Sequence, residues 1–432
     1  MSSCCSVSAK SMICPRLRRV LVGFYSMVAH LVGLALVVLL FAGCGGGGAP
    51  PGVELVFRHS RMPGQDDPLP RLLRGFEREH PGVRVTHEPL PWTADVQHQF
   101  YVINLEGRAA GFDVLMVDVI WTAEFARAGW LLDLTDRWPA AERGEHFEAT
   151  VATAMLDGRV WAVPWVMNVG LLYYRSDLLD ASGFAPPRSY EELAHQARVV
   201  MERAADRRLG GFVWQGRQYE GLVVNVLEEL WARGVELVAT NGRVLVDLDG
   251  AAAALGFRRR LLTDGISPSL VTGADEEQTR REFGAGRAVF LRNWPYARRL
   301  FERPTSAVRG RVGVTALPGG GALGGAHLAI NRATHHPELA WQLVRFLTSD
   351  RAQLAIAEAV GLHPTKPKLL EPALRPIFAA ARPRPITPWY QTLSATMQPA
   401  FSAAITGVTP PRDALATARL QLEYFLADRW AQ

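Results

Sequence analysis

The sequence predicts an α/β fold divided into two lobes, and three observations support this prediction. A chain of 432 residues exceeds what one hydrophobic core usually supports. Short β-branched runs alternate with helical runs from residue 53 onward, which is typical of α/β sheets. Between the strand-like runs 160–163 and 169–174 stands Pro164, which lacks the N–H that a central strand needs. We therefore expect the chain to cross between lobes at Pro164, although one kinked strand in a single core would give the same pattern.

The first part of the α/β body alternates strands with a helix. Residues 53–57 alternate apolar and polar side chains, as a half-buried strand does. Residues 70–79 have helical spacing, and a His-Pro-Gly turn leads to a second strand at 82–88. Residues 112–118 are apolar enough for a buried parallel strand that ends at Asp118.

The same alternation continues beyond the expected crossover. Helices are expected at residues 190–204, 221–231, 251–264 and 337–348, and strands at 288–291, 312–318 and 323–330. A glycine-rich turn precedes the strand at 288–291, and Pro295 stops it, as Pro164 stops the earlier one. Two proline-limited strands that each lead to Trp and Asn indicate one cleft between the lobes.

Charge and cysteine content exclude several functions. The formal net charge is +5, but four basic residues are the only charged ones before residue 44, which leaves +1 for the remainder. A nearly neutral body lacks the basic surface that nucleic-acid binding needs, so no nucleic-acid partner is expected. All four cysteines lie within the first 44 residues, so neither a disulfide framework nor a cysteine metal site follows them. The histidines show no metal-ligand spacing, and we expect no metal and no cofactor.

The first 43 residues have the layout of an export signal, with arginines before an apolar run at 20–41. The run ends in Ala-Gly-Cys44, which resembles a bacterial lipobox and implies cleavage before Cys44 and lipid on its thiol. We assign residues 1–43 to the signal peptide and 44–52 to the lipidated cysteine and a glycine-rich tether. The protein is then exported and anchored at the cell membrane, facing the periplasm or the exterior. An uncleaved membrane helix is the alternative, because the run is long enough to span a bilayer.

Aromatic and polar residues follow the predicted strands at their carboxyl ends, where ligands sit in α/β sheets. Asp118 and Trp121 follow one strand, although Asp118 or Thr122 could equally cap a helix that begins there. A sugar presents apolar faces ringed by hydroxyls, so flat rings and polar groups together suit it. The candidate rings are Trp121, Trp165, Trp214, Trp294 and Tyr296, and the candidate polar groups are Asp118, Asn168 and Arg384.

Five ordered motifs carry a resemblance to a known family. They lie at residues 113–134, 164–175, 212–220, 292–296 and 324–330. Together they resemble the family 1 extracellular solute-binding proteins of ABC sugar importers, in particular the trehalose/maltose-binding type. The resemblance implies a monomer that binds a di- or oligosaccharide, passes it to the permease subunits of an ABC transporter and catalyses no reaction.

The resemblance also implies a two-lobed periplasmic-binding-protein fold of class II, like that of maltose-binding proteins. One lobe would comprise residues 53–163 and 312–350, and the other residues 164–311 and 351–432. By position, the sugar-contacting residues would be Asp118, Asn168, Trp294, Tyr296, Gly325 and Arg384, with Gln65 and Asp66 matched less firmly. Relatives usually carry tryptophan where this chain has Ala326, and many carry aspartate at Asn168, so we expect the preferred sugar to differ.

Two other functions compete with sugar binding. A glycoside hydrolase needs two carboxylates across the scissile bond, for which Asp118 with Glu220 or Glu282 are candidates. A binder of a non-sugar or phosphorylated ligand, such as glycerol phosphate, would use Arg292 and Arg384. In each case the ligand would lie in the cleft between the lobes.

Overall fold

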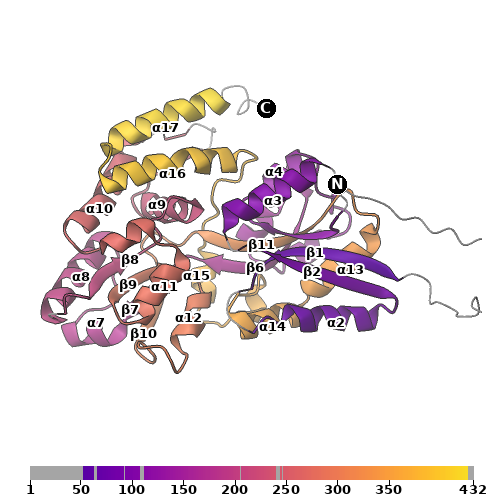
Figure 1. Cartoon of the computed structure of the whole chain (residues 1–432), viewed down its shortest axis with the longest axis horizontal. Helices are drawn as coiled ribbons and strands as arrows, with labels where there is room; N and C mark the ends of the chain where they lie inside the picture. The colour runs from indigo at the N-terminus through magenta and orange to yellow at the C-terminus, as the bar shows by residue number, and fades with distance from the viewer. Residues whose placement is uncertain are drawn as a thin grey trace, which may run out of the picture. The chain divides into compact units, whose positions relative to one another are not determined.

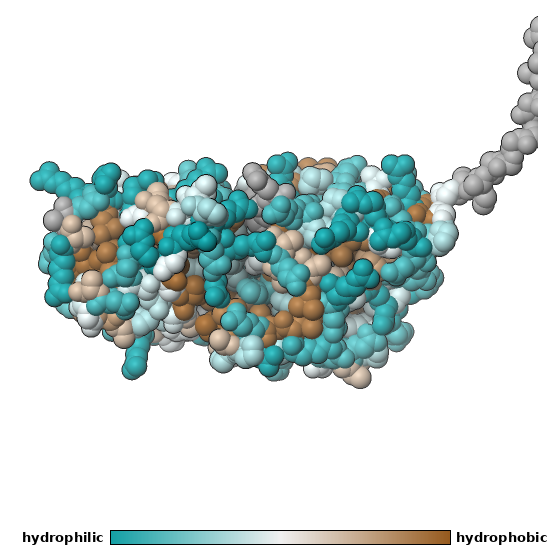
Figure 2. All heavy atoms as spheres, turned by 90° about the horizontal axis from the view of Figure 1, so that it is seen from below, coloured by the Kyte–Doolittle hydropathy of each residue, from teal (hydrophilic) through white to brown (hydrophobic). Residues whose placement is uncertain are grey.

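The computed structural model describes residues 52–62, 66–91, 93–107, 111–204, 206–239, 244–245 and 247–426. The predicted signal peptide, Cys44 and the tether before Gly52 lie outside these residues. Residues Val53–Gln432 form one compact unit, and on the face shown in Figure 2 hydrophilic residues predominate. No helix among the described residues has the length and apolar character needed to cross a membrane.

A five-stranded sheet with the order β2-β1-β3-β11-β6 forms the first lobe (Figure 1). Its strands are β1 (Val53–Ser60), β2 (Val83–Leu90), β3 (Val114–Asp118), β6 (Val163–Val169) and β11 (Leu323–Ile330). β1 is parallel to β2 and β3, whereas β11 is antiparallel to β3 and β6. The helices of this lobe are α2 (Leu69–Glu79), α3 (Ala94–Glu106), α4 (Thr122–Arg127), α5 (Ala140–Arg143), α6 (Glu148–Thr153), α13 (Pro337–Leu347) and α14 (Asp350–Val360), and β4 (Met155–Leu156) and β5 (Arg159–Val160) form a small hairpin.

Apolar side chains decide which helices cover which face of this sheet. Phe76 of α2, Leu343 of α13 and Ile356 of α14 are buried with Phe57 of β1 in one core. Tyr101 of α3 and Phe125 of α4 are buried in a second core, which extends into the other lobe. Burial of such side chains removes apolar surface from water and stabilises each layer by about 25 cal/mol per Å².

A four-stranded sheet with the order β10-β7-β9-β8 forms the second lobe. Its strands are β7 (Leu171–Arg175), β8 (Gly210–Val213), β9 (Ala288–Asn293) and β10 (Val312–Ala316). Its helices are α7 (Ser176–Ser182), α8 (Tyr190–Ala204), α9 (Glu220–Ala232), α10 (Leu248–Thr263), α11 (Glu276–Gly284), α12 (Tyr296–Phe301), α16 (Tyr390–Thr406) and α17 (Pro411–Leu426). The C-terminal helices α16 and α17 pack on α9 and α10 (Figure 1). Between α14 and α16 in sequence lies the short α15 (Arg375–Ala379).

The first crossing between lobes lies at Gly170, so the prediction of a crossing at Pro164 is wrong. β6 runs through Pro164, which pairs with His327 of β11. A register shift between Ala326 and His327 marks a bulge there, and a bulge accommodates a residue without an N–H. The chain enters the second sheet at Leu171.

The other two predicted lobe boundaries also differ from the structure. β10, at Val312–Ala316, pairs with β7 in the second sheet, so the second crossing is the segment 317–322. α14 keeps its apolar face in the core of the first lobe, so the third crossing follows Val360. Residues 312–316 therefore belong to the second lobe and residues 351–360 to the first, because each element stays whole within one lobe.

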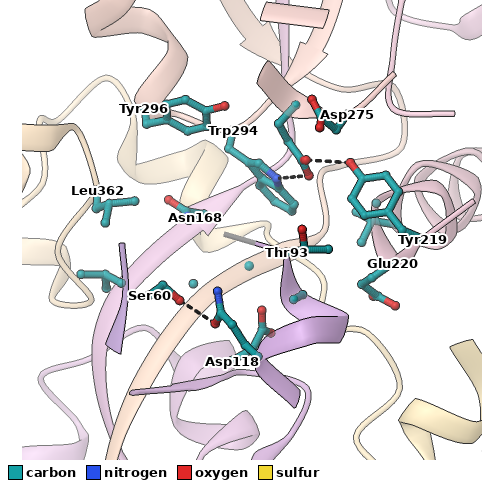
Figure 3. A pocket seen from close by; sticks show the side chains of 18 of the residues that line it. Ser60, Thr93, Asp118, Asn168, Tyr219, Glu220, Asp275, Trp294, Tyr296 and Leu362 are labelled. Atoms are coloured by element: carbon teal, nitrogen blue, oxygen red, sulfur yellow. Dashed lines mark hydrogen bonds between the residues drawn. The ribbon is translucent and has the colours of Figure 1, made fainter. Parts of the chain in front are cut away.

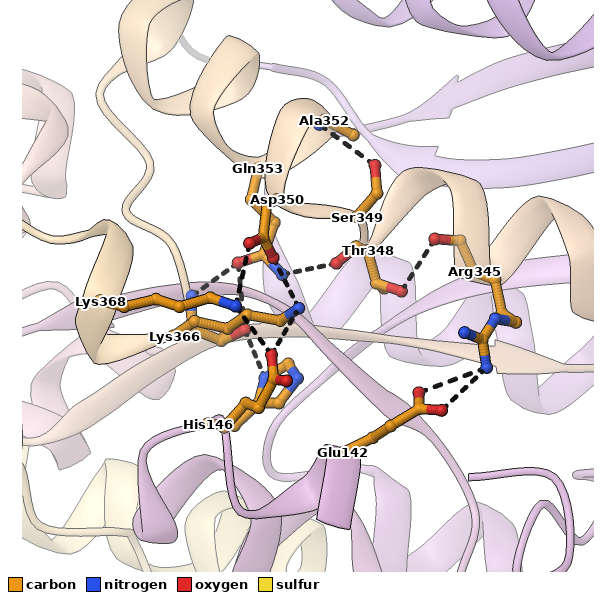
Figure 4. Close-up of polar contacts among 12 residues, drawn as sticks. Glu142, His146, Arg345, Thr348, Ser349, Asp350, Ala352, Gln353, Lys366 and Lys368 are labelled. Atoms are coloured by element: carbon orange, nitrogen blue, oxygen red, sulfur yellow. Dashed lines mark hydrogen bonds and ion pairs between the residues drawn. The ribbon is translucent and has the colours of Figure 1, made fainter. Parts of the chain in front are cut away.

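A network of polar side chains fastens the third crossing to the first lobe (Figure 4). Lys366 Nζ lies 2.7 Å from Asp350 Oδ1, and Lys368 Nζ lies 3.0 Å from Glu145 Oε2. The backbone N–H of Thr365 also donates to Gln353 Oε1 at 2.8 Å. These contacts fix the start of the third crossing segment, residues 365–368, on the first lobe.

Four enclosed histidines make the stability of the fold depend on pH. Burial lowers the pKa of His327 to about 3 and the pKa values of His59, His146 and His363 to about 4. A histidine whose folded pKa lies below its unfolded value of about 6.5 stays neutral in the native state, so unfolding takes up protons in acid. The free energy of unfolding is therefore highest above pH 6.5, and it decreases as the pH falls from 6.5 towards the pKa values of these histidines in the folded state.

We expect the free energy of unfolding of the full chain, measured by urea titration, to fall by about 2 kcal/mol for each of these histidines between pH 7.5 and 5. His327→Asn should show a shallower decline, because one buried imidazole is removed. His335→Asn, which replaces an exposed histidine, should follow the wild type. Equal declines in all three proteins would contradict this prediction.

Candidate functional site

A pocket between the two lobes is lined by residues from both (Figure 3). The first lobe contributes polar and small residues, which include Ser60, Thr93, Gln97, Asp118, Asn168, Gly324 and Gly325. The second lobe contributes aromatic and charged residues, which include Arg217, Tyr219, Glu220, Asp275, Glu276, Trp294 and Tyr296. Arg384, from the segment before α16, completes the lining.

Trp294 is held at the end of β9 by three hydrogen bonds. Its backbone N–H donates to Asn293 Oδ1 at 2.7 Å, and the Tyr173 hydroxyl donates to its carbonyl oxygen at 2.9 Å. Its indole Nε1–H donates to Glu276 Oε1 at 3.3 Å. Pro295 then starts α12, so the strand delivers this ring to the pocket and ends there.

Two tyrosines of the same wall are fixed by carboxylates of α11. The Tyr219 hydroxyl donates to Glu276 Oε2 at 2.6 Å, and the Tyr296 hydroxyl donates to Glu277 Oε1 at 2.9 Å. Burial, reinforced by the carboxylates, raises the pKa of both tyrosines well above the ordinary value. Both hydroxyls therefore stay protonated and keep donating. These hydrogen bonds fix the orientation of the aromatic side chains in this wall.

Asp118, Arg384 and Glu220 form an ion-paired bridge between the lobes. Arg384 Nη2 lies 3.2 Å from Asp118 Oδ1, and Nη1 lies 2.7 Å from Glu220 Oε1. Asp118 ends β3 of the first lobe, whereas Glu220 begins α9 of the second. The Tyr390 hydroxyl also donates to Glu220 Oε1 at 2.8 Å, and the Ser394 hydroxyl donates to Oε2.

The charges of this bridge balance one another. Burial alone would lower the pKa of the Arg384 guanidinium, but Asp118, Tyr390 and Glu220 together raise that pKa above its ordinary value. Burial raises the pKa of the Glu220 carboxyl, while Arg384 opposes that shift. The guanidinium stays charged, because two acidic side chains face it in a site with little water.

Among the described residues of the pocket wall, two side-chain polar atoms have no hydrogen-bond partner. They are Oδ1 of Asn168, an acceptor, and Nε of Arg384, a donor. Both atoms are shielded from solvent, and an unpaired polar atom in such a place costs about 1–3 kcal/mol. Hydroxyl groups of a ligand would satisfy both once opening of the lobes exposes these atoms, because a hydroxyl donates and accepts.

The two glycines of β11 let the backbone approach the pocket. Gly325 has a φ of +115°, and a Cβ there would lie 2.2 Å from the carbonyl oxygen of Val166. A Cβ at Gly324 would lie 3.0 Å from Cζ3 of the Trp294 ring. Only glycine fits at Gly325, and at Gly324 it lets the indole of the second lobe touch the first.

The structure does not bring four of the predicted residues that it describes to the pocket. Trp121 packs against Tyr101 and Phe125, and Trp165 packs against Phe57. Trp214 lies under Arg258 and donates to Ser267 Oγ. The prediction that these three rings stack on a sugar is wrong, because each is at most 2% exposed. Asp66 is exposed and does not line the pocket, and Gln65 lies outside the described residues.

Several lining residues escaped prediction from the sequence. Thr93 and Gln97 lie at the start of α3, whose apolar residues do not follow one face and gave no helical signal. Asp275 and Glu276 lie at the start of α11, where Asp275 and Gln278 form a capping box. That motif could have located the helix start, but not its position in the pocket.

Comparison with known proteins gives consistent matches. The family described as bacterial extracellular solute-binding protein matches residues 62–354. A probable ABC transporter-binding protein of Deinococcus radiodurans is 33% identical over 365 residues, which make up 79% of this chain and 86% of that protein.

Solved structures confirm the two-lobed α/β fold. The maltose-bound MalE3 of T. maritima is 36% identical, with a TM-score of 0.80 over 87% of this chain and 100% of that chain. The GacH receptor of Streptomyces glaucescens GLA.O is 22% identical, with a TM-score of 0.76 over 87% of this chain and 99% of that chain. The GacH receptor is known both in the unliganded form and in complex with acarbose.

We expect Arg384→Met to lower the free energy of unfolding by about 3–5 kcal/mol, because Glu220 then remains buried without its cation. Urea titration of the full chain measures this loss. Arg198→Met removes an exposed pair with Asp264 and should cost less than about 1 kcal/mol. Equal losses in the two variants would contradict a structural role for the bridge.

Proposed function

The chain belongs to the bacterial extracellular solute-binding proteins of ABC transporters, and we propose from this premise that its interlobe pocket captures a di- or oligosaccharide of trehalose or maltose type. As a member of this family the protein is exported. The observation that carries the proposal is the pair of unsatisfied atoms, Asn168 Oδ1 and Arg384 Nε, beside the aromatic wall of Trp294 and Tyr296. Sugars offer hydroxyls for the first and apolar ring faces for the second.

The charge of the pocket favours a neutral ligand. Among the described lining residues there are four carboxylates, Asp118, Glu220, Asp275 and Glu276, against three arginines, Arg61, Arg217 and Arg384. Arg384 is paired with two of these carboxylates, and Arg217 lies 3.0 Å from Asp275. A phosphorylated ligand would have to displace these pairs.

Arg292 does not support the phosphate alternative either. Its guanidinium is 1% exposed, lies 2.6 Å from Glu228 and does not line the pocket. The two second carboxylates that the sequence offered for a hydrolase, Glu282 and Glu220, are also engaged in other contacts. Glu282 is paired with Arg287 away from the pocket, and both oxygens of Glu220 already accept hydrogen bonds from Arg384, Tyr390 and Ser394.

In the proposed mechanism, the two lobes close over the sugar. The first lobe binds hydroxyls through Asp118 and Asn168, while the second covers the ring faces with Trp294 and Tyr296. A ligand stabilises the closed form only through contacts that the open form lacks, and here those contacts come from opposite lobes. The closed form then presents the sugar to the permease, and lipid on Cys44 keeps the protein at the membrane.

We expect calorimetry of the full chain to detect micromolar or tighter binding of one sugar among trehalose, maltose and sucrose, and none of glycerol phosphate. Trp294→Ala should weaken that binding about 10- to 100-fold, because a stacking ring is lost. Trp341→Ala removes a partly buried tryptophan of α13 outside the pocket and should change the affinity less than twofold. Binding of glycerol phosphate alone, or turnover of a disaccharide, would overturn the proposal.

We expect Cys44→Ala to abolish lipid attachment and to move the protein from the membrane fraction to the medium or periplasm. Metabolic labelling with a radioactive fatty acid measures the first effect, and cell fractionation measures the second. Cys14→Ala provides the control, because Cys14 lies in the predicted signal peptide. Labelling that survives in the Cys44 variant would show that the anchor is elsewhere.

A further inference from the structure

A buried ion pair lies directly beneath the aromatic wall of the pocket. Arg292 donates through Nη2 to Glu228 Oε1 at 2.6 Å and through Nε to Glu228 Oε2 at 2.8 Å. The two side chains are 1% and 0% exposed, respectively. Such a bidentate pair holds its partners in a fixed plane. Neither the family resemblance nor the pocket lining gives this pair a role.

Glu228 also binds the backbone that crosses between the lobes. Its Oε1 accepts the backbone N–H of Ala322 at 3.0 Å, in the second crossing. It also lies against the first crossing, because a Cβ at Gly170 would be 1.9 Å from the same oxygen. The two crossings touch each other as well, since the N–H of Gly170 donates to the carbonyl oxygen of Ala322 at 3.1 Å. One carboxylate therefore contacts two of the three segments that cross between the lobes.

Arg292 supports the ring of Trp294. The guanidinium carbon lies 4.0 Å from the ring centroid, so the cation covers one face of the indole. Gly324 meets the edge of the same ring, and the Nε1–H is bound by Glu276. A ligand can therefore stack only on the opposite face. The orientation of that face depends on the ion pair behind it.

A second buried pair in the same lobe lacks these contacts. Glu229 accepts from Arg258 Nε at 2.6 Å, and both side chains are 1% exposed. Arg258 lies 4.6 Å from the ring of Trp214, which does not line the pocket. Glu228 and Glu229 are thus adjacent residues of α9 with like burial and like partners, but only Glu228 reaches the crossings.

We propose that Glu228 and Arg292 are positioning residues that join the sugar-stacking face of Trp294 to the two crossing segments as one rigid support. The part that concerns sugar affinity rests on the proposed function above. The part that concerns the crossings does not, because the contacts of Glu228 with Gly170 and Ala322 exist without any ligand. Lobe movement and ring orientation would then change together when the pair is broken.

The test compares Glu228→Gln with its matched control Glu229→Gln in the full chain. Hydrogen–deuterium exchange without ligand should rise at least fivefold at residues 317–323 in Glu228→Gln and stay at the wild-type rate in Glu229→Gln. Calorimetry with maltose and trehalose should show at least tenfold weaker binding in Glu228→Gln and less than a twofold change in Glu229→Gln. Equal effects of the two substitutions on either measurement would overturn the proposal.

A second variant distinguishes loss of the ion pair from unfolding caused by an unpaired buried charge. The double substitution Glu228→Met with Arg292→Met removes both charges and leaves neither buried alone. Urea unfolding should show a cooperative transition, while exchange at 317–323 remains fast and sugar binding remains weak. If the double variant exchanges and binds like the wild type, the pair has no positioning role. If the wild type binds neither these two sugars nor sucrose, the proposed function fails, yet the exchange comparison still decides the role of Glu228 at the crossings.

Discussion

The close approach of the first and second crossing segments, at Gly170 and at residues 317–322, constrains the rest of the structure. A Cβ at Gly321 would lie 2.1 Å from the carbonyl oxygen of Gly170, so the segments can meet only because residue 321 lacks a side chain. The N–H of Leu323 donates to the carbonyl oxygen of Arg382, and the N–H of Arg382 donates to that of Gly321. The segment that leads to Arg384 is thereby fixed to the same place. Both sheets, and the pocket between them, take their relative position from this junction.

Charge is concentrated at the same junction and is neutralised there in pairs. Asp118 and Glu220 share Arg384, and Glu228 binds Arg292. Burying one such charge alone would cost several kcal/mol, whereas pairing it with hydrogen bonds offsets most of the cost. These ion pairs therefore allow charged side chains to line the pocket while its net charge stays close to zero. Such a pocket can bind an uncharged, hydroxyl-rich molecule without competing for a counter-ion.

The sequence predicted the elements and the strand-end residues better than the crossings or the rings. α8 was predicted at its observed bounds, because helical periodicity can be read from the local sequence. Asp118, Trp294 and Tyr296 reach the pocket, because they lie at or just after the carboxyl ends of strands. The crossing was wrongly predicted at Pro164, because the bulge that accommodates the proline, with Trp165 of β6 as its extra residue, depends on pairing with the distant strand β11. Trp121, Trp165 and Trp214 were misassigned for a related reason: an aromatic residue near a strand end faces the pocket or the core according to tertiary packing.

The two lobes contribute different kinds of side chain to the pocket. Every described aromatic residue of the pocket lining, namely Tyr219, Trp294 and Tyr296, belongs to the second lobe. The first lobe supplies Ser60, Gln97 and Asn168 instead, and Ala326 is buried in its core rather than at the pocket. Neither wall alone can satisfy both the apolar faces and the hydroxyls of a sugar. A sugar would make its full set of contacts only when the lobes are closed. The difference between its binding free energies to the closed and open forms is what would favour closure.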